Sequence, residues 1–199
     1  MSSPVLPGPW LSGTVASVLS GDSLVIRSSS GAEKTVLLAG IAAPRLARRG
    51  DDSARDEPHA FQSREFLRKR AVGAPVVFRV EYLAGQKEAA SVFVGKEKEN
   101  LSLCCVGNGW SRTKAGQHAN AAELSAAEAA ARAAGRGVWA KGEPPVRRVK
   151  DLTRDAHAAK TFLGFLQRAG RVACLVDYVI SPGRLKLLVH KENAEVRQA

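Results

Sequence analysis

Cysteine is scarce in this sequence, and the few cysteines match no metal-binding or disulfide pattern. Cys104, Cys105 and Cys174 form no CxxC pair, and no cluster of cysteine and histidine has metal-ligand spacing. This argues against a structural zinc site and against the disulfide framework of a small secreted protein. We therefore expect three small, buried, apolar side chains in a reducing compartment.

Long apolar runs and a secretion signal are also missing. No stretch of about 20 apolar residues occurs, so the sequence predicts no membrane-spanning helix and no membrane partner. The start of the chain, MSSPVLPGPW, has no basic region followed by an apolar region. These absences predict a cytoplasmic protein, or one that is also nuclear, rather than a secreted one.

Acidic residues are in short supply, because 19 Asp and Glu face 30 Lys and Arg, a formal net charge of +11. Such a surplus favours a polyanionic partner such as nucleic acid, with a generally basic surface that binds nothing specific as the alternative.

Aromatic residues are few, at 6% of the chain. Trp10 and Trp110 are open cases for base stacking. The core is expected to hold Phe61, Phe66, Phe78, Phe93 and Trp139.

What the sequence does contain is a regular alternation of apolar residues over Gly13–Ile41, which predicts three short strands in a meander. Asp22 lies in the first tight turn of this meander. The segment after the third strand, IAAPRLARR, has no acidic residue at all. Because loops on a rigid sheet commonly carry function, Asp22 is the first candidate site residue.

Further segments complete a predicted first domain. A helix is expected over 59–72, strands over 75–82 and 89–95, a short helix over 100–108 and an Ala-rich helix over 121–134. Gly137–Trp139 is expected to be a strand-like segment or a turn anchor. A five-stranded antiparallel sheet with three helices is a mostly β, α+β fold, and this arrangement is typical of an OB-fold barrel.

Glu143-Pro144-Pro145 breaks the pattern and predicts a domain boundary. Beyond it, Gly170–Leu175 echoes Gly13–Val18, and Arg184–Val189 stands where residues 24–27 stood. Chance similarity between two meanders is the alternative. We otherwise expect further domains after Ala199 and the following organisation: an N-terminal extension (1–10), a first domain (11–142), a linker (143–153) and an incomplete second copy (154–199).

The most specific stretches are DEPHAFQSREFLRK over 56–69 and AAGRGVW over 133–139. Together with the meander, they resemble the first staphylococcal-nuclease-like domain of the Tudor staphylococcal nuclease family. The resemblance covers 11–142 as this domain and roughly 150–199 as the beginning of the second.

The resemblance implies an OB-fold barrel and an RNA-binding scaffold. It also implies roles in RNA silencing (RNA interference, in the complex called RISC), in ribonucleoprotein complexes and in transcription as a coactivator. The RNA is expected to be structured or double-stranded, and the protein partners are those of ribonucleoprotein complexes. Calcium-dependent nuclease activity is attributed to the family as well.

The resemblance also assigns the positions of a nuclease site, where two carboxylates hold calcium, a glutamate handles water and two arginines bind phosphate. Asp22 matches the first carboxylate. The other positions carry altered residues: Ala42 at the second carboxylate, Arg45 at the glutamate, Leu37 at the first arginine and Lys87 at the second. This predicts no cleavage by this domain and no metal cofactor. We interpret Asp22 mainly as a turn carboxylate capping backbone amides, and an active calcium nuclease with Asp22 as ligand is the alternative.

Basic side chains near the former site are candidates for phosphate contacts, which give affinity without reading sequence. A basic helix end also suits the helix dipole and solubility, which is the alternative for the helix residues. A third hypothesis is a protein-interaction platform in a groove between adjacent domains. The candidate nucleic-acid contacts are Arg45, Arg48, Arg49, Lys87, Arg64, Arg68 and Lys69.

Overall fold

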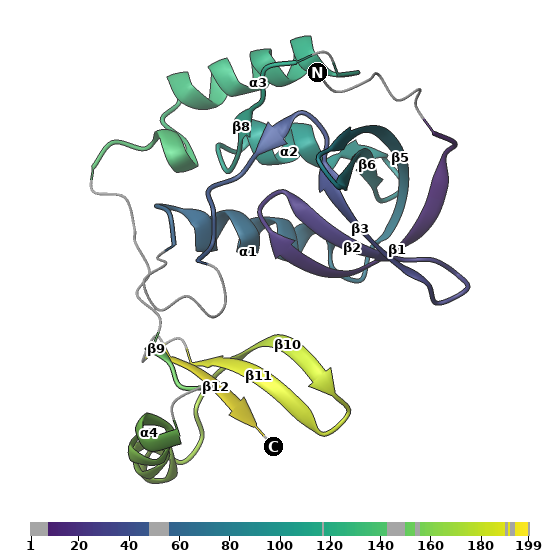
Figure 1. Cartoon of the computed structure of the whole chain (residues 1–199). Helices are drawn as coiled ribbons and strands as arrows, with labels where there is room; N and C mark the ends of the chain where they lie inside the picture. Colours follow the sequence, from purple (N-terminus) through teal and green to yellow (C-terminus); the bar gives the residue numbers. More distant parts are fainter. Residues whose placement is uncertain are drawn as a thin grey trace. The chain divides into compact units, whose positions relative to one another are not determined.

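The computed structural model describes residues 8–47, 56–116, 118–142, 150–153, 156–189, 191 and 194–198. The chain divides into two compact units, Met1–Val146 (unit 1) and Arg147–Ala199 (unit 2) (Figure 1). Each unit is described by itself. No helix among the described residues combines the length and the apolar character needed to cross a membrane.

Unit 1 is built on a closed five-stranded barrel. Its sheet runs in the order β3-β2-β1-β5-β6, and a further pairing of β3 with β6 closes the ring. The strands are β1 (Leu11–Ser20), β2 (Ser23–Arg27), β3 (Glu33–Leu38), β5 (Pro75–Ala84) and β6 (Lys87–Val94). The predicted OB-fold barrel is confirmed.

One interface of the barrel differs from the all-antiparallel sheet predicted from the sequence. The β3–β6 pair is parallel, whereas the β1–β2, β2–β3, β1–β5 and β5–β6 pairs are antiparallel. An odd number of strands cannot alternate in direction all the way around a closed ring. One parallel pair is therefore required by closure.

The barrel core follows from the alternation along the strands, since residues two apart share one face of a strand. Val15, Leu24, Ile26, Val36 and Leu38 are each at most 2% exposed. They point inward from three successive strands. Arg27, next to Ile26, faces solvent and pairs with Glu33, and Lys34, near the start of β3, is exposed and pairs with Glu88.

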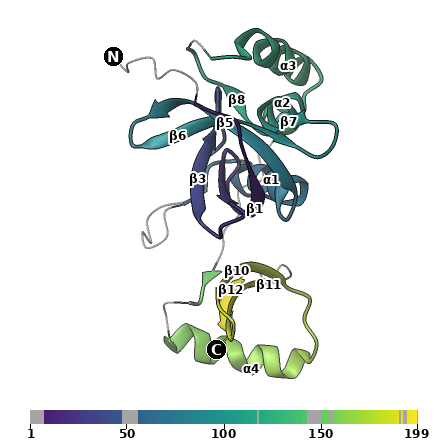
Figure 2. The same ribbon diagram turned by 90° about the vertical axis from the view of Figure 1, so that its right-hand side faces the viewer.

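Three helices cover the barrel, as predicted: α1 (Ala60–Ala71), α2 (Leu101–Gly107) and α3 (Ala121–Ala133). Helix α1 packs on β1, and α2 packs on α3 (Figure 2). Leu67 of α1 and Leu101 of α2 are fully buried. Short strands β4 (Ile41–Ala42), β7 (Glu99–Asn100) and β8 (Arg112–Thr113) join these layers, β7 beside β6 and β4 beside β8.

The Gly137–Trp139 segment is a 3₁₀ turn, η1, rather than a strand. Gly137 has a φ of 54°, in the left-handed region that favours glycine. A Cβ on Gly137 would lie 2.2 Å from the carbonyl oxygen of Gly109. The close approach of these two backbone segments explains why the segment is a turn, one of the two expected alternatives, and not strand-like.

Unit 2 contains β9 (Lys150–Asp151), α4 (Ala156–Ala169), β10 (Leu175–Ser181), β11 (Arg184–Val189) and β12 (Ala194–Gln198). Strands β10, β11 and β12 form an antiparallel meander, and β9 lies parallel to β12. The sequence reasoning placed no helix at α4.

The register of unit 2 corrects the alignment of the internal repeat. Strand β1 has register shifts after Val15 and Val18, and β10 has shifts after Val176 and Val179. The two meanders therefore match with Val15 on Val176, whereas the proposed match of Gly170–Leu175 with Gly13–Val18 falls mostly before β10. The assignment of residues 154–199 to a second nuclease-like domain stays a prediction.

The cysteines agree only partly with the expectation of three buried thiols. Cys105 is buried and Cys104 partly buried, but Cys174 is exposed in the segment before β10. Burial raises the pKa of the Cys104 thiol to about 11, with Glu99 adding to the effect. Burial also raises the pKa of Cys105 well above its ordinary value. Both thiols are therefore neutral and unreactive near neutral pH.

Candidate nucleic-acid interface

The turn between β1 and β2 is held tightly against α1. A Cβ added to Gly21 would lie 1.9 Å from Ser63 Oγ and 2.8 Å from the Cβ of Ala43. Ser63 is fully buried, and its hydroxyl donates to the carbonyl oxygen of Trp110 at 2.7 Å. No side chain fits at position 21, so glycine is required there and the next residue, Asp22, has a fixed backbone position.

Both carboxylate oxygens of Asp22 accept hydrogen bonds within the protein. The Ser20 hydroxyl donates to Oδ1 at 2.6 Å, and the Ala43 amide donates to Oδ2 at 3.1 Å. The Asp22 carbonyl oxygen accepts from the Leu38 amide at 2.8 Å. Asp22 thus ties the β1–β2 turn to the end of β3 and to the segment after β4, as expected of a turn carboxylate.

The residues around Asp22 do not fit a calcium ion. Calcium takes six to eight oxygen ligands and commonly needs several carboxylates. The described part of the chain contains no group of three His, Cys, Asp or Glu that could hold a metal. Asp22 is the one acidic side chain at the positions that the family resemblance assigns, and its oxygens are already engaged.

The structure brings Leu37 and Ala42 close to Asp22. Leu37 is half-buried in β3, in register with Ser23 of β2 and with Ala89 of β6. Ala42 lies in β4, directly before the Ala43 amide that donates to Asp22. Neither side chain can bind a metal or a phosphate, so this part of the site offers no catalytic group.

Arg45 lies past β4 with its side chain in solvent. Its backbone amide donates to Glu57 Oε2 at 2.9 Å, and the Glu57 amide donates to the Arg45 carbonyl oxygen at 2.8 Å. The guanidinium Nε lies 3.7 Å from Glu57 Oε1, and the Arg45 side chain is 88% exposed. A surface ion pair of this kind is worth about 1 kcal/mol or less. Arg45 is therefore free to meet a phosphate.

Lys87 is exposed at the start of β6, two residues before Ala89, which is the β6 partner of Leu37. Lys87 therefore lies on β6, which pairs with β3, and β3 in turn pairs with β2 next to Asp22. Arg48 and Arg49 lie outside the described residues.

The α1 candidates separate into different environments. Arg64 is only 8% exposed, so it is not a surface cation and does not suit a phosphate contact. Arg68 forms a two-oxygen contact with Glu65, with Nε at 3.0 and 2.9 Å from the carboxylate oxygens. Lys69 is exposed, and among the described residues no carboxylate forms a salt bridge with it. The structure thus favours Lys69 over the two arginines.

Aromatic side chains are more exposed than the sequence suggested. Phe78 is buried, but the other four residues expected in the core are half-buried. Of the open cases, Trp10 is 51% exposed, with the Arg79 guanidinium 4.9 Å from its ring centroid. Trp110 is half-buried and lies 6.1 Å from Phe66, centroid to centroid.

Sequence reasoning missed one basic residue beside the former site. Arg112 of β8 is in register with Ala42 of β4, although 70 positions separate them in the sequence numbering. Arg112 lies in no motif of the meander. A two-residue strand far along the chain left no periodic signal that could have paired it with Ala42.

Comparisons with known proteins support the expected family. Residues 35–141 match the family described as staphylococcal nuclease homologue. The chain is 41% identical over 149 residues to Ribonuclease TUDOR 2 of Arabidopsis thaliana, a match that covers 66% of this chain and 14% of that protein. It is 36% identical over 188 residues to Staphylococcal nuclease domain-containing protein 1 of Drosophila melanogaster, which covers 88% of this chain and 20% of the relative.

A protein of the same name from Schizosaccharomyces pombe is 25% identical over 194 residues, covering 92% of this chain and 21% of the relative. The chain spans about a fifth or less of the length of these curated relatives. The closed five-stranded barrel is the fold expected for this family, and the family match covers residues 35–141 of unit 1. The chain belongs to the staphylococcal nuclease homologue family, among the Tudor staphylococcal nuclease proteins.

Proposed function

We propose that unit 1 binds RNA through its phosphate backbone and does not cleave it. The observation that carries this proposal is the state of Asp22. It is the single acidic residue at the family's site positions, and both of its oxygens accept hydrogen bonds from the turn and from Ala43. The module keeps the nuclease fold without a donor set for calcium.

Cleavage of a phosphodiester needs a group that activates water and cations that stabilise the charge developing on the phosphate. Arg45 stands at the position of the family's glutamate, and a guanidinium stays protonated near neutral pH, so it cannot act as a base. Leu37 offers no clamp for the phosphate. Loss of one such group commonly lowers kcat by about 100- to 1000-fold.

Binding is supported by charge and exposure. Arg45 and Lys87 are exposed cations at positions that the family resemblance assigns, Lys69 is exposed on α1, and the whole chain has a net charge of +11. Contacts to phosphates tolerate any sequence and favour duplex RNA, which proteins recognise through backbone and shape. We also propose that the protein acts in the cytoplasm or the nucleus as a scaffold in RNA silencing and in ribonucleoprotein complexes.

The test is a binding and cleavage assay with the whole chain on short duplex and single-stranded RNA, with calcium or with EDTA. We expect salt-sensitive binding, stronger for the duplex, and intact RNA in both conditions. Arg45→Gln/Lys87→Gln should weaken binding. The matched control Lys96→Gln/Lys98→Gln, in the exposed turn at the other end of β6, removes the same charge and should change the affinity little.

The alternative is an active calcium nuclease, which is favoured by the name of the Arabidopsis relatives, Ribonuclease TUDOR 1 and 2. Calcium-stimulated cleavage that disappears in Asp22→Asn would establish that alternative and overturn the proposal. Affinity insensitive to salt and to the Arg45/Lys87 change would instead favour the protein-interaction platform.

A further inference from the structure

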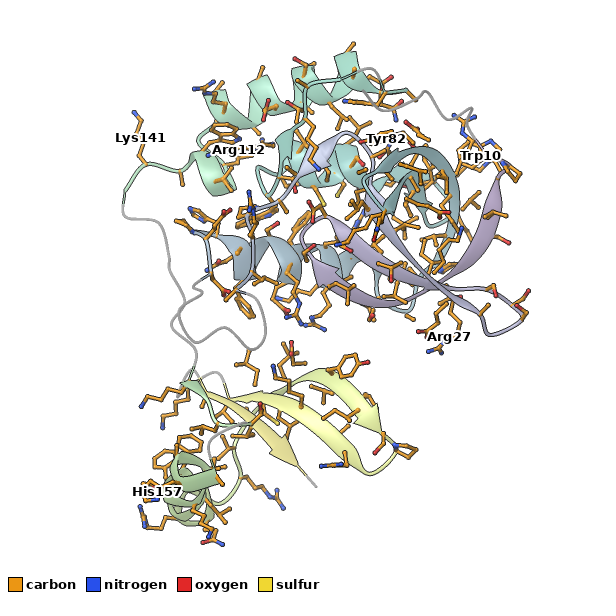
Figure 3. The ribbon with its side chains drawn as sticks, in the orientation of Figure 1. Trp10, Arg27, Tyr82, Arg112, Lys141 and His157 are labelled. Carbon is orange, nitrogen blue, oxygen red and sulfur yellow. The ribbon has the colours of Figure 1, made fainter. Side chains whose placement is uncertain are left out.

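A second group of cations gathers around Trp139, at residues to which the family resemblance assigns no role. The guanidinium carbons of Arg112 and Arg132 lie 4.9 Å and 5.0 Å from the Trp139 ring centroid. Arg136 and Lys141 are exposed on either side of η1. We call Arg112, Arg132, Arg136 and Trp139 the Trp139 cluster. Figure 3 places Arg112 and Lys141 at one end of unit 1 and Trp10 at the other.

The backbone around Trp139 is held firmly, so the cluster has a defined geometry. Val138 donates its amide to the Gly109 carbonyl oxygen at 2.8 Å, and Trp139 donates to the Arg136 carbonyl oxygen at 3.0 Å. The Arg136 Nη1 donates to the Gly107 carbonyl oxygen at 3.1 Å. These bonds fix η1 to the end of α2, and stacking on an indole orders a guanidinium while leaving its N–H edges available.

The cluster lacks the carboxylate partners that neutralise arginines elsewhere in unit 1. Arg27, Arg68 and Arg70 form ion pairs at 2.7, 2.8 and 2.5 Å. Within the described residues, no salt bridge involves Arg112, Arg132 or Arg136.

The nearest acidic residue along α3 is already engaged. Glu128 lies one turn before Arg132, but its carboxylate accepts from the Thr113 amide at 3.0 Å and from the Thr113 hydroxyl at 2.6 Å. These hydrogen bonds come from neutral groups and leave the Glu128 charge in place, but the three arginines outnumber this one carboxylate. Like charges repel one another, and an anionic ligand would reduce that repulsion.

The cluster begins beside the former nuclease site, and this position points to a backbone phosphate as the anion. Arg112 and Ala42 are directly opposed in the β4–β8 pair, and opposed side chains lie on the same face of an antiparallel ladder. Arg112 therefore begins beside the position where the family resemblance places a metal-binding carboxylate. A phosphate backbone that crosses the former site would meet Arg112 and then Arg132.

We propose that the Trp139 cluster is a second phosphate-binding surface, which extends the track of a nucleic-acid backbone beyond the Asp22 region. Arg112 and Arg132 each contact a backbone phosphate. The inference takes its ligand from the proposed function but rests on other residues. RNA and DNA share the phosphate chemistry, and a DNA duplex of the same sequence distinguishes them.

The experiment titrates the whole chain with a short RNA duplex at several salt concentrations. Arg112→Gln/Arg132→Gln should bind more weakly. Its slope of log Kd against log salt should be flatter by about 2, because each lost phosphate contact removes about 0.9 from the slope. The control Lys96→Gln/Lys98→Gln loses the same charge and should keep the wild-type slope. A parallel titration with DNA shows whether the backbone alone suffices.

A second measurement does not depend on the variants. The indole N–H resonance of Trp139, assigned by its loss in Trp139→Phe, should shift when RNA is added to the wild-type chain. RNA binding without this shift, and with an unchanged slope in the arginine variant, would overturn the inference and leave the proposed function intact. A shift with loss of binding in the arginine variant, but no effect of Arg45→Gln/Lys87→Gln, would support the inference and contradict the proposed site. No RNA binding by the wild-type chain would overturn both.

Discussion

The β1–β2 turn gives Asp22 a structural role of its own. Gly21 leaves no room for a side chain beside Ser63 of α1, and Asp22 then reaches the Ala43 amide and the Ser20 hydroxyl. A buried or half-buried amide left without a partner costs about 1 to 3 kcal/mol. The need to satisfy the Ala43 amide explains Asp22 without invoking a metal.

The burial of His59 affects its protonation. It lies directly before α1 at a φ of 65°, is 9% exposed and sits 6.4 Å from Trp110, centroid to centroid. Burial lowers its pKa below the ordinary value of 6.5. The folded protein therefore resists protonation of His59 more than the unfolded chain does.

We predict that His59 makes the protein less stable as the pH falls. A group whose pKa is lowered by folding contributes its full stability above its unfolded pKa and loses it as the pH falls through and below that value. Wild type should lose more unfolding free energy than His59→Asn between pH 7.5 and pH 5, measured by urea denaturation. Asparagine is suitable because it tolerates a positive φ. Parallel pH curves for the two proteins would contradict the prediction.

At the scale of elements, the barrel could be predicted because alternation and turn residues are local signals. Val15, Leu24, Ile26 and Leu38 point inward as the pattern required. The two-residue strands β4 and β8 are too short to leave such a signal. In α4, the ring centroids of Phe162 and Phe165 lie 5.5 Å apart; these phenylalanines are three positions apart, a helical spacing, but the repeat expected from the sequence begins only after α4 and predicts no helix there.

The candidate site was predictable only where a motif fixed it. The family resemblance assigns Ala42 and Leu37 to the site, and the structure places both next to the Asp22 turn. The Trp139 cluster could not be predicted, because Arg112 lies in β8, Arg132 in α3, and Arg136 and Trp139 at the start and end of the η1 turn, and only folding brings these segments together. Trp139 was expected in the core, whereas it is half-buried with two guanidinium groups over its ring.

Helix α2 offers a stability prediction with an internal control. Asn100 is 7% exposed, and its Oδ1 accepts from the Ser102 amide at 2.9 Å and from the Leu103 amide at 3.4 Å. Asn100→Ala should lower the free energy of unfolding by about 1 kcal/mol, in the range of measured N-cap losses. Asn120 precedes α3 but makes no side-chain capping bond.

Asn120→Ala is therefore the matched control, and chemical denaturation monitored by circular dichroism should show little change for it. An Asn100→Ala loss no larger than the loss for Asn120→Ala would contradict the prediction, because it could then not be attributed to the capping hydrogen bonds.

At the scale of the whole molecule, the net charge of +11 matters less than where the exposed cations lie. Several arginines form close ion pairs, whereas Arg45 forms a long, exposed one with Glu57, and among the described residues no salt bridge involves Lys87, Arg112 or Arg132. Arg45 lies three residues after β4, and the other three lie on β6, β8 and α3. If each of these four cations binds one phosphate, the chain makes four phosphate contacts.

Four phosphate contacts predict a definite salt dependence. The affinity for duplex RNA should fall with a slope of log K against log salt of about −3.6, at 0.9 per contact. The measurement is fluorescence anisotropy of a labelled duplex over a range of potassium chloride concentrations, without divalent ions. Combining Arg45→Gln/Lys87→Gln with Arg112→Gln/Arg132→Gln should remove nearly all of the slope. A wild-type slope close to zero would contradict backbone binding, and a steep slope retained in the combined variant would assign the contacts to other cations of the chain.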